Sequence, residues 1–318
     1  MTALRAGART LLLLVVLVAG AACAGSDGRA DSEAGQQPQG AALRITLGTQ
    51  EFPEARILGE LWRQALAVNG YTVDLRKGVG PAADLDALLE DDEIDGHVAY
   101  TGTVLSVVAG EEVSGLDPKE TYRRAKAFYD GRDMAMSDMT PFQNKDAIAT
   151  TREFARAQRL SSIGDLRRVE PLTIGGRPEF EDLELGLKGL KERYGLTGAA
   201  FRPVELGEQY AALDDGVVQA VDAFTTDPQL RSGDYTILAD PQLLFGSQNV
   251  VMTVRKEKLD SVGGKKFLAV VSAVNRRLTQ SDMVDMNAEV TGGERDEEVA
   301  RRFLRDAGLA EPMRFEEE

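Results

Sequence analysis

The chain has 318 residues, with 37 basic and 52 acidic side chains and a formal net charge of −15. This acidic balance argues against nucleic-acid binding and against attraction to anionic lipid surfaces. Only one cysteine is present, so no disulfide can form within the chain, and the fold must be held by its hydrophobic core, for which the length is ample.

The first 22 residues are typical of a secretory signal peptide. Arg5 and Arg9 precede an apolar run at 11–18, which is far too short to span a bilayer. Small residues then lead to Cys23, and this order is similar to a bacterial lipoprotein cleavage site, with Gly20 where leucine is usual. We expect a lipid on Cys23, a flexible tether at 23–42 and a location on the outer face of the cell membrane. The alternative is an ordinary secreted protein with a stray cysteine.

From residue 43 onward, predicted strands and helices alternate. Apolar periodicity predicts the first strands and helices at 43–47, 54–68, 71–75, 82–90 and 94–100. An extended stretch at 134–150 follows, and Ser162 with Asp165 predicts a capping box. The second half continues with strands and helices at 172–174, 185–193, 201–206, 208–213, 217–224 and 250–255, then three helices at 265–278, 281–289 and 296–307. This alternation is typical of an α/β fold with mostly parallel sheets.

Two stretches of the chain echo each other without a gap. Residues 87–103 read ALLEDDEIDGHVAYTGT, and residues 211–227 read AALDDGVVQAVDAFTTD. Each reads as a helix end, an acidic turn, a short strand and an aromatic residue followed by threonine. The aromatic residues are Tyr100 and Phe224. Chance is the alternative, but the echo predicts two similar lobes that each present one ring at a strand end, where ligands bind in α/β sheets.

The echo and the helical C-terminus suggest how the lobes are divided. Residues 43–138 and 229–312 would form the first lobe, residues 139–228 an inserted second lobe, and residues 313–318 a charged tail. Two crossings near 137–141 and 227–228 would then form a hinge. Two consecutive domains are the alternative, but that arrangement would leave the C-terminal helices without a strand partner.

The sequence contains few residues suited to catalysis and several aromatic residues suited to ligand binding. His97 is the only histidine and lies in a predicted strand, and no nucleophile motif, metal cluster or cofactor motif is evident. Trp62 is expected in the core. Tyr100, Tyr210 and Phe224 lie at strand ends or helix starts, and aromatic faces attract cations such as quaternary ammonium groups.

Six segments carry a resemblance to a known family. In chain order they are GTQEFPEARILGEL (48–61), AYTGT (99–103), PFQNKDAIA (141–149), GGRPEF (175–180), EQYAAL (208–213) and DAFTTD (222–227). They are similar to the glycine betaine, choline and carnitine-binding proteins of osmoprotectant ABC transporters. The resemblance implies an α/β, two-lobed type II periplasmic-binding-protein fold with two hinge crossovers and a ligand clamped between the lobes.

The resemblance also implies an aromatic cage, which the family builds from four tyrosines. Tyr100 and Tyr210 match two of them, and Phe224 replaces a third while keeping the ring. The fourth falls on Asp146, where a carboxylate would attract a cation as a point charge.

Four further positions bear on the ligand. Thr103 and Asn144 match residues that line the family's cage. The lysine and arginine with which relatives hold a ligand carboxylate correspond to Gln50 and Leu183. A cation without an acid group, such as choline, is therefore favoured over glycine betaine.

These matches imply a function in transport rather than catalysis. The expected protein is a monomeric, lipid-anchored solute-binding protein without a cofactor. It would deliver a small cationic or polar solute to an ABC permease and, through it, to the ATPase. A sensor or scavenger lipoprotein that has lost transport is one alternative. An enzyme on the same fold is another, with Asp146 as its only candidate base.

Overall fold

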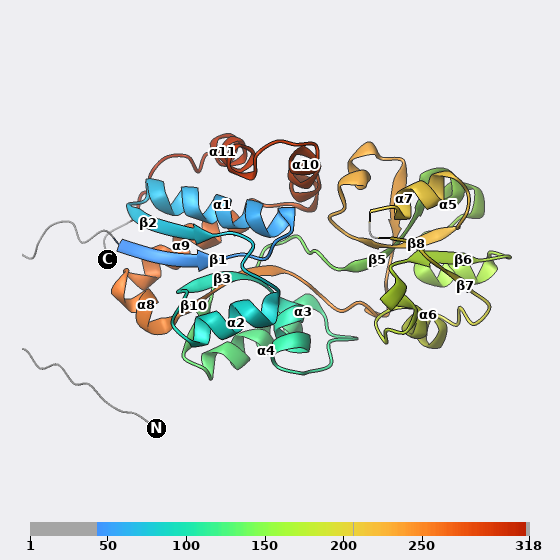
Figure 1. Cartoon of the computed structure of the whole chain (residues 1–318), viewed down its shortest axis with the longest axis horizontal. Coiled ribbons are helices and arrows are strands. Elements are labelled where there is room, and N and C mark those ends of the chain that lie inside the picture. The colour runs from blue at the N-terminus through green and yellow to red at the C-terminus, as the bar shows by residue number, and fades with distance from the viewer. Residues whose placement is uncertain (1–42, 206, 316–318) are drawn as a thin grey trace, which may run out of the picture. The chain divides into compact units, whose positions relative to one another are not determined.

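The computed structural model describes residues 43–205 and 207–315, which contain two five-stranded sheets flanked by helices (Figure 1). The predicted signal peptide, Cys23 and the tether lie outside the described residues, as do the last three residues of the predicted tail. The α/β class predicted from the alternation of strands and helices is confirmed.

The first sheet has the strand order β2-β1-β3-β10-β4. Its strands are β1 (Leu43–Gly48), β2 (Tyr71–Arg76), β3 (Gly96–Tyr100), β4 (Met134–Met136) and β10 (Val250–Arg255). Strands β2, β1 and β3 run parallel, whereas β10 is antiparallel to both β3 and β4.

The second sheet repeats this plan with the order β7-β6-β8-β5-β9. Its strands are β5 (Asp146–Thr151), β6 (Thr173–Gly176), β7 (Ala200–Pro203), β8 (Ala220–Phe224) and β9 (Tyr235–Leu238). Strands β7, β6 and β8 run parallel, and β5 is antiparallel to β8 and β9. The echoed segments thus occupy equivalent places, because β3 and β8 are each the central strand of a sheet.

The expectation of mostly parallel sheets is wrong for the strands that follow a crossing. Strand β5 enters the second sheet from the first lobe, and β10 enters the first sheet from the second lobe. Each of these two strands enters its sheet at the edge where the neighbouring parallel strands end. It is therefore antiparallel to those strands. Both sheets are mixed for this reason.

All seven predicted helices are present at or near their expected places. The helices are α1 (Pro53–Val68), α2 (Ala82–Glu90), α3 (Thr101–Thr103), α4 (Pro118–Asp130), α5 (Arg152–Gln158), α6 (Leu187–Arg193), α7 (Gln209–Asp214), α8 (Lys256–Ser261), α9 (Gly264–Asn275), α10 (Gln280–Thr291) and α11 (Asp296–Asp306). The capping box of Ser162 and Asp165 is confirmed and opens the 3₁₀ turn Ile163–Arg168. Helices α3, α4, α5 and α8 are not among the predicted helices.

Helix α1, which lies early in the described chain, packs against the C-terminal helices. Trp62 is fully buried, as expected, and its indole N–H donates to Asn275 Oδ1 of α9 at 2.8 Å. Helices α9, α10 and α11 all pack against α1, and one hydrophobic core holds side chains from β1, α1 and these three helices. The C-terminal helices therefore complete the first lobe.

The two chain crossings between the lobes lie side by side. One comprises residues 137–145, the other residues 239–249, and an antiparallel bridge joins Gln143 to Asn249. The Asn249 side-chain amide also donates to the Thr140 carbonyl at 2.9 Å. The sequence places the second boundary near residue 228, but after the 3₁₀ turn Pro228–Ser232 the chain returns to the second sheet as β9.

Candidate functional site

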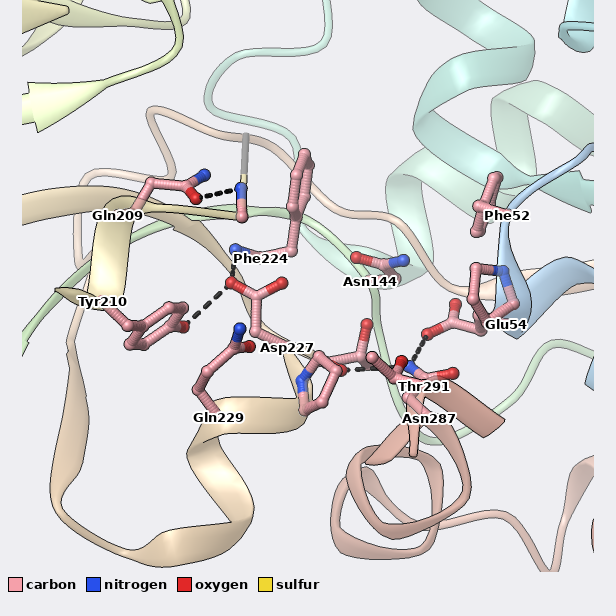
Figure 2. Close-up of a pocket in the computed structure, with 14 residues that line it drawn as sticks. Phe52, Glu54, Asn144, Gln209, Tyr210, Phe224, Asp227, Gln229, Asn287 and Thr291 are labelled. Atoms are coloured by element: carbon pink, nitrogen blue, oxygen red, sulfur yellow. Dashed lines mark hydrogen bonds between the residues drawn. The ribbon is translucent and has the colours of Figure 1, made fainter. Parts of the chain in front are cut away.

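A cavity of about 410 Å³ is lined by residues of both lobes (Figure 2). The first lobe and the crossing contribute Phe52, Pro53, Glu54, Asn144, Asn287 and Thr291, and the second lobe contributes Gly207, Gln209, Tyr210, Phe224, Thr226, Asp227, Pro228 and Gln229. Glu54 and Asp227 are the only charged members, so the lining contains carboxylates and no basic side chain. The lining therefore offers no side chain that could pair with an anionic group of a ligand.

The start of α1 shapes the first-lobe side of the cavity. Pro53 occupies the first helical position, where its fixed φ suits a helix, and Phe52 before it is extended. Phe52 consequently leaves the helix at the cavity edge, where its side chain is 38% exposed. Its ring centroid lies 5.8 Å from that of Tyr100.

Glu54 lies in the first turn of α1 and is almost completely buried. The Tyr100 hydroxyl donates to its Oε1 at 2.9 Å, and the Asn287 side-chain amide donates to its Oε2 at 3.1 Å. Burial raises the pKa of Glu54 against the opposing effect of these hydrogen bonds. The carboxylate thus has neutral donors, and within the described residues it forms no ion pair with Lys, Arg or His.

On the second-lobe side, Asp227 organises two predicted cage residues. Its Oδ2 accepts hydrogen bonds from the Tyr210 hydroxyl and from the Phe224 backbone N–H, both at 2.8 Å. Tyr210 also packs edge-on against Tyr235, with ring centroids 4.7 Å apart. Burial raises the pKa of Asp227. Asp227 therefore links the Tyr210 side chain to the backbone at Phe224 and adds a second carboxylate to the cavity lining.

Asp146 lies beside Phe224 in the sheet but is not among the lining residues. Its Oδ1 forms a 2.9 Å ion pair with Arg177, which also pairs with the buried Asp222. The Arg177 guanidinium carbon lies 5.4 Å from the centroid of the Phe224 ring. The charge of Asp146 is thus already partnered within the protein.

The remaining predicted site residues lie around the crossings and the strand ends. The Thr103 backbone N–H donates to Gln248 Oε1 at 2.9 Å, which ties the segment after β3 to the second crossing. Gln50 is buried, and its Oε1 has no hydrogen-bond partner among the described residues. Asn144 lies between Phe224 and Glu54 in Figure 2, with its amide nitrogen turned toward Glu54. Leu183 is exposed and outside the lining.

The fold therefore brings Tyr210, Phe224 and Asn144 together in one cavity. Tyr100 does not line the cavity, but its hydroxyl donates a hydrogen bond to Glu54, which does. Gln50, Thr103 and Asp146 are not among the lining residues either. The lining residues that sequence reasoning missed are Phe52, Pro53, Glu54, Gly207, Gln209, Thr226, Asp227, Pro228, Gln229, Asn287 and Thr291. Phe52 and Glu54 lie within the segment 48–61, and Asp227 within 222–227, so the segments that resemble the family already contained them.

Metal clusters and membrane-spanning helices are absent from the part of the chain that the structure describes. No group of three or more His, Cys, Asp or Glu side chains there is arranged to hold a metal ion. No helix among the described residues is long and apolar enough to cross a membrane. The lone histidine, His97, is buried in β3, where its Nδ1 lies 2.9 Å from the Val98 carbonyl.

Comparisons with known proteins cover almost the whole described chain. The family model for the substrate binding domain of ABC-type glycine betaine transport systems matches residues 44–306. A glycine-betaine-binding protein of Pseudomonas aeruginosa is 29% identical, over 84% of this chain and 89% of that protein. The Helicobacter pylori ergothioneine transport permease/ergothioneine binding protein EgtU is 22% identical over 83% of this chain, which spans 48% of that protein.

A solved structure shows the same fold. A crystal structure of a glycine betaine/carnitine/choline ABC transporter matches with a TM-score of 0.78 and 22% identity, over 84% of this chain and 100% of that chain. This likeness confirms the predicted type II periplasmic-binding-protein fold.

Proposed function

The chain belongs to the family of substrate-binding domains of ABC-type glycine betaine transport systems, and on this basis we propose that it captures a choline-like cation. Its role in an ABC transporter is to bind a small solute outside the cytoplasm and to work with the permease. The solute would be held between the lobes, and contacts made only in the closed state would favour closure.

The charge of the cavity carries this proposal. Glu54 and Asp227 line it together with the rings of Tyr210 and Phe224, and no lining residue is basic. A quaternary ammonium group is attracted to ring faces and carboxylates alike. The carboxylate of glycine betaine would find no cationic partner in this lining, so choline is favoured over glycine betaine.

The remaining predicted residues belong to the same proposal. Tyr100 would complete the aromatic wall together with Tyr210 and Phe224. Asn144, Thr103, Gln50 and Asp146 would lie around it and contact polar parts of the solute on closure. We further propose that signal-peptide cleavage leaves Cys23 at the N-terminus, where a lipid anchors the protein to the outer face of the membrane as a monomer.

Titration of the purified protein with choline tests the proposal. Choline should release or absorb heat on binding and raise the melting temperature, and glycine betaine should bind more weakly. Tyr210→Ala and Phe224→Ala should each weaken choline binding by about 2- to 30-fold, since one ring contributes about 0.5–2 kcal/mol. Phe224→Tyr keeps a ring and should retain most of the affinity. Absence of both heat and thermal shift in the wild type would refute a quaternary-amine ligand.

A further inference from the structure

The buried carboxylate of Glu54 lacks a positive partner in the described part of the protein. The other buried carboxylates differ in this respect, because Asp86 pairs with Arg132, Glu60 with Lys77, Asp95 with Arg255, and Asp222 with Arg177. The half-buried Asp227 across the cavity shares the feature, since its donors are the Tyr210 hydroxyl and the Phe224 backbone N–H. Removing a charge from water without a partner is costly, and neutral hydrogen-bond donors offset only part of that cost. The position of Glu54 in the first turn of the 16-residue helix α1 favours its ionised form without supplying a full counter-charge.

Glu54 lies at the cavity together with the asparagine to which it is hydrogen-bonded. Glu54 and Asn287 both line it, and the Asn287 side-chain amide donates to Glu54 Oε2 and to the Thr226 carbonyl. These two donations fix the orientation of the amide and leave Asn287 Oδ1, in a residue only 6% exposed, without a partner among the described residues. The wall therefore offers a carboxylate and a free acceptor oxygen.

Phe52 adds an aromatic face to the same wall. It lies two residues before Glu54, and its 38% exposed ring extends the aromatic surface beyond Tyr100. An exposed phenylalanine at the edge of a cavity gains stability when a ligand or a closing lobe covers it. In Figure 2, Glu54 and Asp227 lie on opposite sides of the cavity, so a cation between them would face a carboxylate from each lobe.

We propose that Phe52 and Glu54, at the start of α1, form the cation-binding wall of the first lobe, with Glu54 as the counter-ion of the solute. This assignment rests on the proposed function. Phe52 and Glu54 would then take over the role of the fourth tyrosine in the family's cage, whose position in this sequence is occupied by Asp146. Asp146 already has Arg177 as its partner, so the ligand is the positive charge that Glu54 lacks.

A pair of ligands that differ only in charge tests the role of Glu54. Choline and 3,3-dimethyl-1-butanol have the same shape, but the alcohol carries a neutral carbon in place of the ammonium nitrogen. The ratio of their Kd values measures discrimination by charge and does not depend on the fraction of active protein. Glu54→Gln should reduce this ratio by at least about tenfold, because close charge pairs at interfaces commonly contribute that much.

Matched variants separate the competing explanations. Glu51→Gln removes the same charge from an exposed position beside α1 and should leave the ratio unchanged. Phe52→Leu keeps an apolar side chain and should weaken choline severalfold more than the neutral alcohol, which provides a second test if Glu54→Gln folds poorly. An unchanged ratio in both Phe52→Leu and Glu54→Gln overturns the proposal, as does a loss of discrimination in Asp146→Asn alone. If the wild type binds no quaternary amine at all, it is the proposed function that fails.

Discussion

At the scale of single residues, the second lobe places three ionisable side chains next to the ring of Phe224. Arg177 pairs with both Asp146 and Asp222 and lies against the Phe224 ring. One guanidinium therefore pairs with both of these carboxylates and, at 3.5 Å, with the exposed Glu179 as well. Burial raises the pKa of Asp222 to about 8 against the effect of Arg177, and the nearby charge of Asp146 raises it further. Proton binding at this cluster is therefore coupled to folding.

The stability of the protein should depend on pH through Asp222. In the unfolded chain this carboxyl ionises near pH 4, whereas in the folded protein it keeps its proton until about pH 8. Its contribution to the free energy of unfolding is complete below about pH 4 and is lost as the pH rises toward 8. Asp222→Asn cannot ionise, so its free energy of unfolding should fall less than that of the wild type between pH 5 and pH 9.

Urea denaturation at the two pH values measures this difference. Asp182→Asn, at an exposed position on the same lobe, serves as the control and should behave as the wild type does. Equal pH dependence in Asp222→Asn and the wild type would show that Asp222 stays ionised in the folded protein across this range.

At the scale of elements, the end of β3 packs closely against the second crossing. Gly102 lies two residues after Tyr100, and a Cβ atom there would come within 2.5 Å of the Ser247 carbonyl oxygen and 2.9 Å of the Gln248 side chain. The Gln248 side chain is in turn hydrogen-bonded to Thr103. The close approach thus holds the strand end that carries Tyr100 against a segment of the hinge.

Gly102→Ala should therefore disturb both stability and binding. The added methyl group would push the crossing away from β3 and lower the free energy of unfolding by about 1–3 kcal/mol, as overpacking does in a tight core. Chemical denaturation measures the loss, and choline titration should show weaker binding. Gly198→Ala is the matched control, because a Cβ there meets no atom within 4 Å. Equal stability of the two variants would mean that the crossing can move to accommodate the methyl group without lowering the free energy of unfolding.

Whole elements also show what sequence patterns can and cannot predict. Helix α1 is predicted from its apolar stripe, and its boundaries differ by one residue from the expectation of 54–68. Helix α4 is not predicted because it is short of apolar residues, with only Thr121, Ala125 and Tyr129 buried. Strand β9 has four residues and gains its place only through pairing with β5, so no local pattern identifies it.

At the scale of the whole molecule, the site depends on contacts between distant parts of the chain. Tyr210 and Phe224 are predictable because each lies in a segment with a recognisable pattern. Glu54 is not, because a glutamate in the first turn of a helix is usually solvated and nothing local marks this one. Only the fold brings Asn287 to it across 233 positions of the sequence. The sign of the cavity's charge follows from Glu54 and Asp227, which the fold brings to the same cavity from segments far apart in the sequence.

The location of the protein should depend on one residue outside the described part. Cys23→Ser removes the thiol to which two acyl chains would be attached, and two chains suffice for stable membrane anchoring where one does not. Cell fractionation should therefore find the variant in the soluble extracytoplasmic fraction and the wild type in the membrane fraction. Ser26→Ala, three residues further on, should leave the distribution unchanged. A variant that stays with the membrane would exclude Cys23 as the anchor.

The pairing of strands beside the cage has a consequence for transport. The last residue of β3, Tyr100, pairs with Val250, and the last residue of β8, Phe224, pairs with Asp146. Val250 and Asp146 are the first residues of their strands after a crossing, so each ring stands beside the chain at the point where it leaves the hinge. A solute that contacts either ring would therefore lie next to the segments that connect the two lobes. We therefore expect the empty and the solute-bound protein to differ in the angle between the lobes, and a permease could recognise the bound form by that difference in shape.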